Sequence, residues 1–264
     1  MNTSLQNLCL RLECAQAEQN QAMAKAVARL NPAGGARCER IAGAYAVYLG
    51  PGHMLNQGLA LGLAGPMTEA DLDRLETVLG TPTTVELSAG ADPSVAPLLA
   101  ARGYRVHLFQ QVWMRDLPAG EDLEPRTALE VRPLRPGEEA LFGKVVFAGF
   151  METDDLDSVD PTPFAATTSA EGTTCFLAFA DGVPLGAGTA GIAGDVATLS
   201  GTSVLPRFRG RGGQGALIRA RLAFARERGC VLAASATLPG THSQVNLERA
   251  GFRVAYPKLE LVKA

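Results

Sequence analysis

The amino-acid sequence predicts an α+β protein built of two domains that share one fold. Its 264 residues are enough for two ordinary domains of about 130 residues each. Apolar residues make up 47% of the chain and charged residues 19%, so both domains can form a substantial core. The segment 98–106 also parallels the segment 246–254, and both copies lie in a predicted order of strand, helix and two closing strands. This internal match indicates a duplication.

The N-terminal half begins with a predicted helix at residues 4–30. Its apolar residues, Met23 and Val27 among them, recur on one face, and Asn31-Pro32 ends it. Thr68 is expected to cap the next helix, with Asp71 at the third helical position. The remaining predicted elements of this half are strands at 43–49, 58–63 and 84–87, a short helix after Asp92-Pro93, and a pair of strands within 104–117.

A polar, proline-containing stretch from Pro118 to Pro136 separates the two halves and is predicted to contain a linker. The predicted division of the chain is a first domain at 1–118, a linker at 119–128 and a second domain at 129–264.

In the second half, Asp181-Gly182 predicts a tight hairpin turn between strands at 175–180 and 183–190. A long helix at 215–228 is expected to end at Gly229, which suits a residue with positive φ. The other predicted elements are a helix at 141–150, an irregular segment at 158–171, strands at 196–204 and 230–236, a helix at 243–249, and strands at 252–255 and 258–262.

One segment of the second half combines arginines and glycines between a strand and a helix. The strand ends at Val204, Pro206 prevents its continuation, and the helix starts near Gly213. Free amides at a helix N-terminus attract phosphate oxygens, and glycines let the backbone approach a ligand closely. Charge-assisted contacts to phosphate are expected from Arg207, Arg209 and Arg211. The alternative is a flexible, solvated turn, which the structured flanks disfavour.

Two other phosphate-binding patterns do not fit this segment. A nucleoside-triphosphate loop requires a lysine, and the segment has none. The glycines at 210, 212 and 215 match the dinucleotide fingerprint, which also requires an acidic residue at the end of the next strand. No acidic residue follows that strand before Glu248, so the dinucleotide interpretation fails.

The segment resembles the signature of the GNAT superfamily of acyl-CoA-dependent N-acyltransferases. In that family a strand ending V-x-P precedes [RQ]-x-x-G-x-[GA] at the start of a helix. Residues 204–206 and 209–214 match, except that Gln214 replaces the usual glycine or alanine. Residues 243–252 are similar to the family's second helix, which ends in G-F. The resemblance covers about 130–264. Together with the internal match between the halves, it implies a tandem of two GNAT-like domains, each a mixed, mostly antiparallel β-sheet flanked by helices.

The resemblance implies acetyl-CoA as the acyl donor and assigns its binding residues. The pyrophosphate would lie on the backbone amides of Arg209, Gly210, Arg211, Gly212, Gly213, Gln214 and Gly215. Ser203 and Val204 would hydrogen-bond the pantetheine arm and polarise the thioester carbonyl. Ser243 and Asn246 would reach the far side of the cofactor. The alternative for this pair is helix capping by Ser243 and a solvent-facing Asn246.

The N-terminal half resembles the family only through its ending, Gly103-Tyr104. Residues 62–68, where a phosphate loop should follow the strand, contain no arginine, and Pro66 lacks an amide donor. We therefore expect a degenerate copy that binds no CoA and has a structural or substrate-shaping role.

The acid–base residues that are common in the family are absent from this chain. Ser200 stands where a glutamate base is usual, and Leu247 where a tyrosine acid is usual. Ser200 is a weak catalytic candidate that would hold a water molecule; the alternative is a serine satisfied locally. An acidic run at 152–157 either attracts a cationic amine or forms a solvated surface. The expected function is N-acetyl transfer to an amine of a small molecule, and the alternative is an inactive acyl-CoA-binding or regulatory protein.

The net charge and the cysteines of the chain limit which binding partners and which cellular compartment are expected. A net charge of −3 argues against nucleic acids and anionic membranes as partners. The five cysteines are scattered and indicate free thiols in the cytoplasm, and no histidine or cysteine spacing predicts a metal site. No secretory leader and no apolar run of about 18 residues is found. We expect a cytoplasmic monomer or homodimer that binds acetyl-CoA and an amine acceptor.

Overall fold

The computed structural model describes residues 3–123 and 127–264 and divides the chain into two compact units. The first unit contains Met1–Trp113, Ala236–Thr241 and Val254–Ala264, and the second contains Met114–Ser235 and His242–Arg253. The C-terminal end of the chain therefore belongs to the same unit as the N-terminal half.

The predicted division at a linker remains a prediction. The segment 119–128 lies within the second unit, and its residues 124–126 lie outside the described residues. The prediction places the last strand in the second domain, whereas Val254–Ala264 packs in the first unit.

The first unit consists of a long helix followed by a sheet with two short helices. Its elements are α1 (Thr3–Leu30), the 3-10 turn η1 (Pro32–Gly34), β1 (Arg37–Ile41), β2 (Ala44–Tyr48), β3 (Gln57–Leu59), α2 (Glu69–Leu79), β4 (Thr83–Ser88), α3 (Val95–Ala101), β5 (Arg105–Asp116, to Trp113 in this unit) and β11 (Arg253–Lys263, from Val254).

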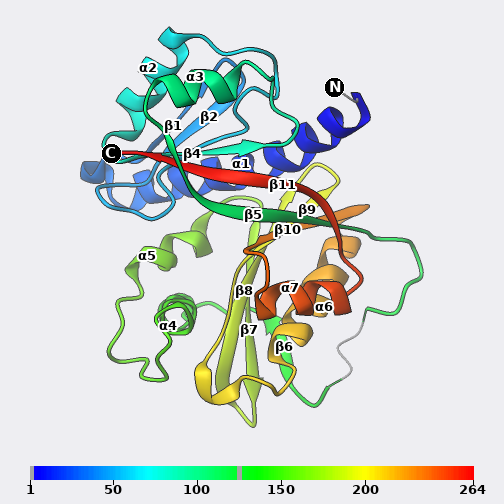
Figure 1. The fold of residues 1–264 in the computed structure, drawn as a ribbon. Helices are drawn as coiled ribbons and strands as arrows, with labels where there is room; N and C mark the ends of the chain where they lie inside the picture. Colours follow the sequence, from blue (N-terminus) through cyan, green and yellow to red (C-terminus); the bar gives the residue numbers. More distant parts are fainter. Residues whose placement is uncertain (1–2, 124–126) are drawn as a thin grey trace. The chain divides into compact units, whose positions relative to one another are not determined.

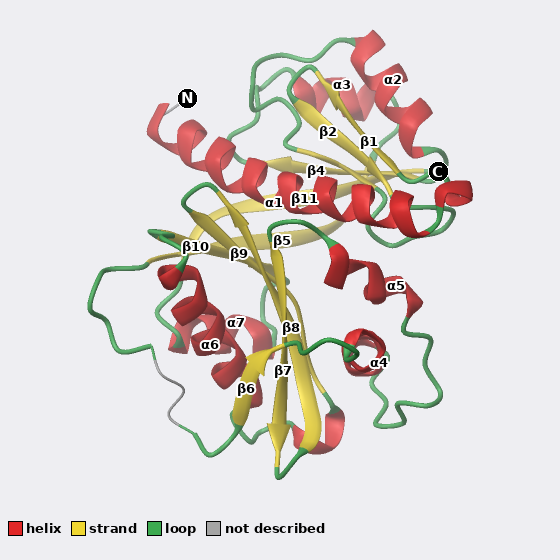
Figure 2. Ribbon diagram, turned by 180° about the vertical axis from the view of Figure 1, so that it is seen from behind, coloured by secondary structure: helices red, strands yellow, loops and turns green. Residues whose placement is uncertain are grey.

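The sheet of the first unit is mixed, in the order β1-β2-β3-β4-β11-β5. Antiparallel pairs join β1 to β2, β2 to β3 and β4 to β11, and a parallel pair joins β3 to β4. The pairing of β11 with β4 runs from Lys258 opposite Ser88 to Lys263 opposite Thr83. Helix α1 covers one face of the sheet, and α2 and α3 cover the other (Figures 1 and 2).

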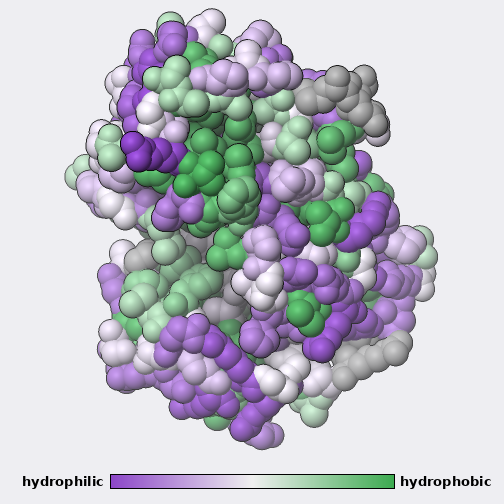
Figure 3. Space-filling model, viewed as in Figure 1, coloured by the Kyte–Doolittle hydropathy of each residue, from purple (hydrophilic) through white to green (hydrophobic). Residues whose placement is uncertain are grey.

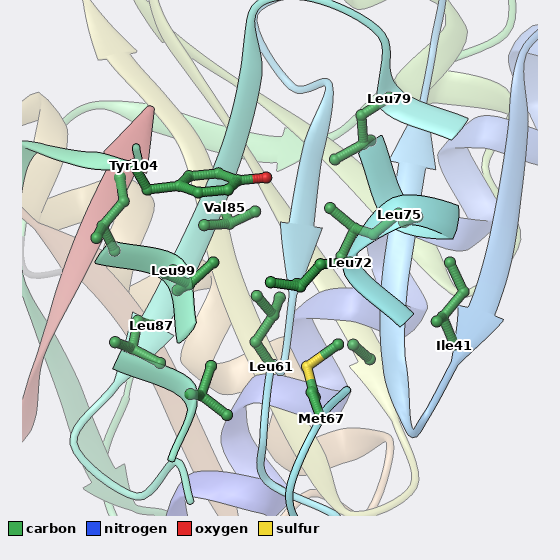
Figure 4. Packing of buried hydrophobic residues seen from close by; sticks show 14 of the residues in the cluster. Ile41, Leu61, Met67, Leu72, Leu75, Leu79, Val85, Leu87, Leu99 and Tyr104 are labelled. Carbon is green, nitrogen blue, oxygen red and sulfur yellow. The ribbon is translucent and has the colours of Figure 1, made fainter. Parts of the chain in front are cut away.

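The core of the first unit lies between the sheet and helices α2 and α3. Leu72 and Leu75 on α2 point toward Val85 on β4, and Leu99 on α3 and Tyr104 lie beside them (Figure 4). Burial of a leucine side chain contributes roughly 1.5–3 kcal/mol relative to exposure, so this cluster accounts for much of the unit's stability.

Local signals predicted most of the first unit correctly. Thr68 caps α2 through its side chain, and Asp71 completes a capping box, as expected. The pair of strands predicted within 104–117 is wrong, because β5 is one continuous strand. The strand β1 was not predicted, because three of its five residues, Arg37, Glu39 and Arg40, are charged and only Ile41 is buried.

The second unit is a sheet covered by helices on both faces. Its elements are β6 (Glu130–Pro133), α4 (Glu139–Phe150), α5 (Thr162–Ala165), the 3-10 turn η2 (Ala166–Ser169), β7 (Thr173–Ala180), β8 (Val183–Ala193), β9 (Val196–Val204), the 3-10 turn η3 (Pro206–Phe208), α6 (Gly213–Glu227), β10 (Leu232–Thr237, to Ser235 in this unit) and α7 (His242–Arg249).

The sheet of the second unit has the order β10-β9-β8-β7-β6. The pairs of β6 with β7, β7 with β8 and β8 with β9 are antiparallel, and β9 pairs with β10 in parallel. Figures 1 and 2 show α4 and α5 on one face and α6 and α7 on the other. The predicted α+β class, with mixed and mostly antiparallel sheets flanked by helices, is confirmed.

Buried side chains occupy both faces of the second sheet. Phe142 and Val145 on α4 pack with Leu177 on β7. On the opposite face Phe176 of β7 packs edge-on against Phe224 of α6, with ring centroids 5.5 Å apart. The two neighbouring residues of β7 thus point to opposite helical layers, as the twofold period of a strand requires.

The turn signals of the second half are confirmed. Asp181 and Gly182 both have positive φ, at 50° and 77°, as a tight hairpin turn requires. Gly229 follows the last turn of α6 with φ 83°. The closing strands predicted at 252–255 and 258–262 are wrong as separate elements, because β11 is continuous.

The described residues contain neither a membrane-spanning helix nor a cluster of metal-ligating side chains. Within 3–123 and 127–264, no helix is long and apolar enough to cross a membrane. In the same residues no group of three or more histidine, cysteine or acidic side chains is placed to hold a metal ion. On the face seen in Figure 3, hydrophilic side chains cover much of the surface near α6 and α7.

Candidate functional site

Strand β9 contains a bulge close to its carboxyl end. Ala187 on β8 lies opposite Ser203, while Thr189 lies opposite Ser200, so β9 has one more residue than β8 in this interval. Gly201 takes the left-handed conformation there, with φ 56°. A bulge bends its strand and locally disrupts the ladder, which changes the direction of the residues that follow.

Strands β9 and β10 are in register over a short distance only. The parallel pairs run from Leu232 opposite Val196 to Ala234 opposite Thr198. Beyond Thr198, no further pair with β10 is in register among the described residues of this unit, although Ser235 Oγ donates to the Leu199 carbonyl at 2.9 Å. The last residues of β9 therefore have a backbone edge without a strand partner on this side.

The chain turns into α6 immediately after β9. The 3-10 turn η3 is closed by bonds from the Phe208 amide to the Leu205 carbonyl, at 2.9 Å, and from the Arg209 amide to the Pro206 carbonyl, at 3.2 Å. Gly210 and Gly212 then have φ of 75° and 82°, a conformation that favours glycine. The Ala216 amide is the first to bond back into α6, donating to the Gly212 carbonyl at 3.0 Å.

These turns leave a set of backbone donors free. The N–H groups of residues 210–215, here called the amide nest, donate to no backbone carbonyl of the described residues. A β-carbon on Gly210, Gly212 or Gly215 would meet no atom within 4 Å, so the nest is open on that side. Gly213 faces the protein instead, because its β-carbon would lie 2.7 Å from Leu185. The nest has the free donors and the positive helix end that an anion site requires.

The three arginines of the segment differ in their contacts. The Arg209 guanidinium forms a two-point ion pair with Glu152, and this pairing holds the pKa of the Glu152 carboxyl below its usual range. Arg207 and Arg211 both lie over the ring of Phe208, at 4.9 and 5.6 Å from its centroid. Among the residues that the structure describes, neither of these two arginines forms an ion pair.

Ser203 offers only its backbone to a ligand. Its hydroxyl is buried and donates to the Val145 carbonyl of α4 at 3.1 Å. A β-carbon on Gly149 would lie 2.5 Å from the Ser203 β-carbon, so the end of α4 packs directly on β9. The predicted contact of Ser203 with the pantetheine arm would therefore have to come from its backbone and not from its hydroxyl.

Three of the predicted site residues are joined to one another. The Gln214 amide nitrogen donates to Ser243 Oγ at 3.0 Å, and the Asn246 amide nitrogen donates to Gln214 Oε1 at 2.6 Å. Gln214 stands at the one position that departs from the family pattern, and its side chain links α6 to α7. This link brings the two helices together beside the amide nest.

Ser200 pairs with a neighbouring hydroxyl. Its Oγ lies 2.8 Å from Thr189 Oγ1, which also donates to the Ser200 carbonyl at 3.0 Å. That Ser200 holds a catalytic water remains a prediction.

The buried Arg221 of α6 also supports the bulge and was not foreseen from the sequence. It donates to the carbonyls of Thr189, at 3.0 Å, and Ser200, at 3.3 Å. Burial lowers the pKa of Arg221 to about 9, which still leaves it charged at neutral pH. A clue lay in Gly188, where a β-carbon would lie 2.9 Å from the Arg221 guanidinium, but a lone glycine does not identify its partner.

The acidic run at 152–157 is engaged within the chain. Asp154 Oδ1 accepts from the Arg207 amide at 3.1 Å, and Asp155 Oδ1 accepts from the Asp157 amide at 2.9 Å. Asp157 also pairs with Lys144 at 2.8 Å. With Glu152 on Arg209, all four acidic side chains have protein partners, which weakens the interpretation that they attract a cationic amine.

The first unit has a different arrangement before its helix α2. The Asp71 carboxylate accepts from the Thr68 amide at 2.8 Å, and the Asp71 amide donates to Thr68 Oγ1 at 3.2 Å. Glu69 adds a second acidic side chain to the first turn of α2. The helix end is therefore capped by its own side chains and carries negative charge, both of which disfavour a phosphate there.

Comparison with known proteins gives one family match. Residues 146–252 match the model of the Acetyltransferase (GNAT) family, and this range contains β9, the amide nest and α7. No curated protein matches the sequence.

Solved structures share the fold over most of the chain. A GCN5-related N-acetyltransferase from Kribbella flavida has a TM-score of 0.63 at 16% identity, covering 97% of this chain and 95% of its own. One from Sphaerobacter thermophilus has a TM-score of 0.55 at 18% identity, covering 78% and 71%. A tandem GNAT protein from the clavulanic acid biosynthesis pathway has a TM-score of 0.52 at 18% identity, covering 82% and 73%.

Proposed function

We propose that the second unit, whose residues 146–252 match the GNAT acetyltransferase family model, transfers an acetyl group from acetyl-CoA to an amine of a small molecule. The observation that carries this proposal is the amide nest at the N-terminus of α6, a helix of 15 residues. Free N–H groups, two glycines with positive φ and an open side are what a diphosphate needs in order to bind the backbone.

The remaining cofactor contacts follow from the neighbouring elements. The pyrophosphate would lie on the amide nest, and the pantetheine arm would run along the free edge of β9 at Ser203 and Val204. The far side of the cofactor would be bordered by the linked side chains of Gln214, Ser243 and Asn246. N–H groups of β9 that face the thioester would stabilise negative charge on its oxygen as the amine attacks.

The chemistry needs a proton acceptor for the amine and a proton for the departing thiolate. The nitrogen of the amine forms a bond to the acetyl carbon, the carbon–sulfur bond breaks, and one proton moves from nitrogen to the medium while the thiolate gains another. All four tyrosines of the chain lie in the first unit, so no tyrosine of the second unit serves as acid. Ser200, exposed and paired with Thr189, is the proposed holder of a water that accepts the amine proton.

A second candidate function is an acyl-CoA-binding or regulatory protein without catalysis. The observation that favours it is the absence of the usual glutamate and tyrosine at positions 200 and 247. The two candidates share the amide nest and differ only in turnover.

The site is tested by titration calorimetry with acetyl-CoA on two variants at one position. Gly215 has open space around its β-carbon and no positive φ, so Gly215→Ala should bind as the wild type does. Gly215→Glu adds a carboxylate at the first turn of α6, which favours the helix but repels phosphate, so we expect affinity to fall more than about tenfold. Equal affinity of the Glu and Ala variants would refute the site.

Turnover is tested by thiol release from acetyl-CoA across a panel of small-molecule amines. Release with any amine supports the acetyltransferase, and binding without release on every amine supports the non-catalytic alternative. Gly215→Glu is the control, because it should abolish release along with binding while retaining the fold.

A further inference from the structure

Arg209 donates four hydrogen bonds within the protein, although its side chain is 46% exposed. Its Nε donates to the Val204 carbonyl at 3.2 Å, and its Nη2 donates to the Gly149 carbonyl at 3.3 Å. Both Nη atoms also donate to the Glu152 carboxylate, with Nη2 at 2.9 Å from Oε1. The guanidinium thus binds the end of β9, the end of α4 and the turn after α4 at once.

The turn after α4 is attached to the arginine–glycine segment at a second point. The Arg207 amide donates to Asp154 Oδ1 at 3.1 Å, and the Thr153 amide donates back to the Ala148 carbonyl of α4 at 3.0 Å. Glu152 has φ 55°, a conformation that glutamate rarely adopts. A residue in such a conformation is held by its surroundings, and the pair with Arg209 is the contact that the Glu152 side chain makes.

We infer that Arg209 and Glu152 form a clasp that fastens the turn 151–154 to the arginine–glycine segment and holds the amide nest in its binding geometry. In this inference, which rests on the proposed function, Arg209 is a positioning residue and not a ligand of the phosphates. The clasp also couples the cofactor segment to the end of α4, so a bound CoA and the turn 151–154 stabilise each other.

The contacts of Arg209 argue against a phosphate ligand. Moving its guanidinium to a phosphate would break the two-point pair with Glu152 and leave the Gly149 carbonyl, at the negative end of α4, without this donor. Arg207 and Arg211, which stack on Phe208 and have no ion-pair partner in the described part of the chain, are the arginines available to an anion. In this proposal Arg209 has a structural role, and Arg207 and Arg211 face the ligand.

The sign of one mutational effect decides between the two roles. If Arg209 were a phosphate ligand restrained by Glu152, then Glu152→Gln would free it and CoA would bind more tightly. If the clasp positions the nest, Glu152→Gln should weaken CoA binding, by up to about fivefold for an exposed ion pair. The matched control is Asp155→Asn, which removes one negative charge from the residue that follows this turn, while its side-chain oxygen can still accept from the Asp157 amide.

Titration calorimetry with CoA measures these affinities. The proteins compared are Glu152→Gln, Arg209→Ala, the double variant of these two, and Asp155→Asn. We expect each single clasp variant to bind more weakly than Asp155→Asn, and the double variant to lose no more than either single one. Tighter binding by Glu152→Gln than by Asp155→Asn, or additive losses in the double variant, would overturn the clasp.

Hydrogen exchange without ligand separates failure of the clasp from failure of the proposed function. Arg209→Ala should speed exchange at residues 151–154, and Arg211→Ala, which removes an unpaired arginine, should not. If the wild type binds no CoA, the proposed function fails, and the exchange result alone then decides whether the clasp exists. Unchanged exchange in Arg209→Ala would overturn it.

Discussion

At the scale of single residues, the first unit contains a buried ionic cluster. Lys258 of β11 lies 2.6 Å from Glu86 of β4 and 3.6 Å from Glu13 of α1, and all three side chains are almost fully buried. Tyr256 donates to Glu13 at 2.9 Å. Burial raises the pKa of Glu13 above its usual range, Lys258 opposes this shift, and the neighbouring Glu86 adds to it. Burial opposes the charge of Lys258, but Glu13 and Glu86 outweigh it and raise the pKa of that lysine.

We predict that Lys258→Met destabilises the first unit by about 3–5 kcal/mol, because it leaves Glu86 buried without its counter-charge. The matched control is Lys263→Met on the same strand. Lys263 pairs with Glu76 at 2.8 Å but is 31% exposed, so its loss should cost at most about 1 kcal/mol. Urea unfolding of both variants measures the difference, and equal losses would show that the buried cluster adds nothing specific.

At the scale of elements, the two units differ in how the free amides at a helix N-terminus are satisfied. Helix α2 satisfies its first amides with the capping box of Thr68 and Asp71. Helix α6 has Gly212 at the corresponding position, with no side-chain cap, and leaves its first amides free. An uncapped helix end is a cost to stability, which a bound anion would offset.

We predict that Thr68→Ala destabilises the first unit by about 1 kcal/mol, through loss of the bond to the Asp71 amide. Thr68→Ser keeps a hydroxyl at the same position and should cost only a fraction of this. Thermal or urea unfolding compares the three proteins. A Ser variant as unstable as the Ala variant would point to lost packing of the Thr68 methyl group, not to the cap.

At the scale of the whole molecule, the last strand completes the sheet of the first unit. β11 lies between β4 and β5 in the strand order and carries Tyr256 and Lys258 into the buried cluster. The N-terminal half therefore cannot complete its own sheet or its own buried ion cluster.

We predict that a chain ending at Arg253 loses the stable fold of the first unit. The edge of β4 would be exposed, and Glu13 and Glu86 would lose Lys258. Hydrogen exchange at residues 83–88 should become fast, while a control chain that lacks only Ala264 should retain slow exchange. Slow exchange at these residues in the shorter chain would show that the first unit is stable without β11.

The sequence by itself determined the features that depend on neighbours along the chain. The hairpin at Asp181-Gly182, the capping box at Thr68 and the helix end at Gly229 each need only a few consecutive residues, because turns and caps are local hydrogen-bond patterns. The resemblance to the GNAT family, whose model matches residues 146–252, was also visible in the sequence, since the strand, the turn and the helix N-terminus are consecutive there.

Only the tertiary structure decided which distant residues meet. The pairing of β11 with β4, the Lys258 cluster, Arg221 beneath the bulge and the pair of Arg209 with Glu152 join residues far apart in sequence. The sequence of a single strand or the position of a single charge does not identify its partner, because many pairings would satisfy the same charge or the same strand ladder. The sequence could therefore mark Arg209 as part of the site, while the fold shows which carboxylate it binds.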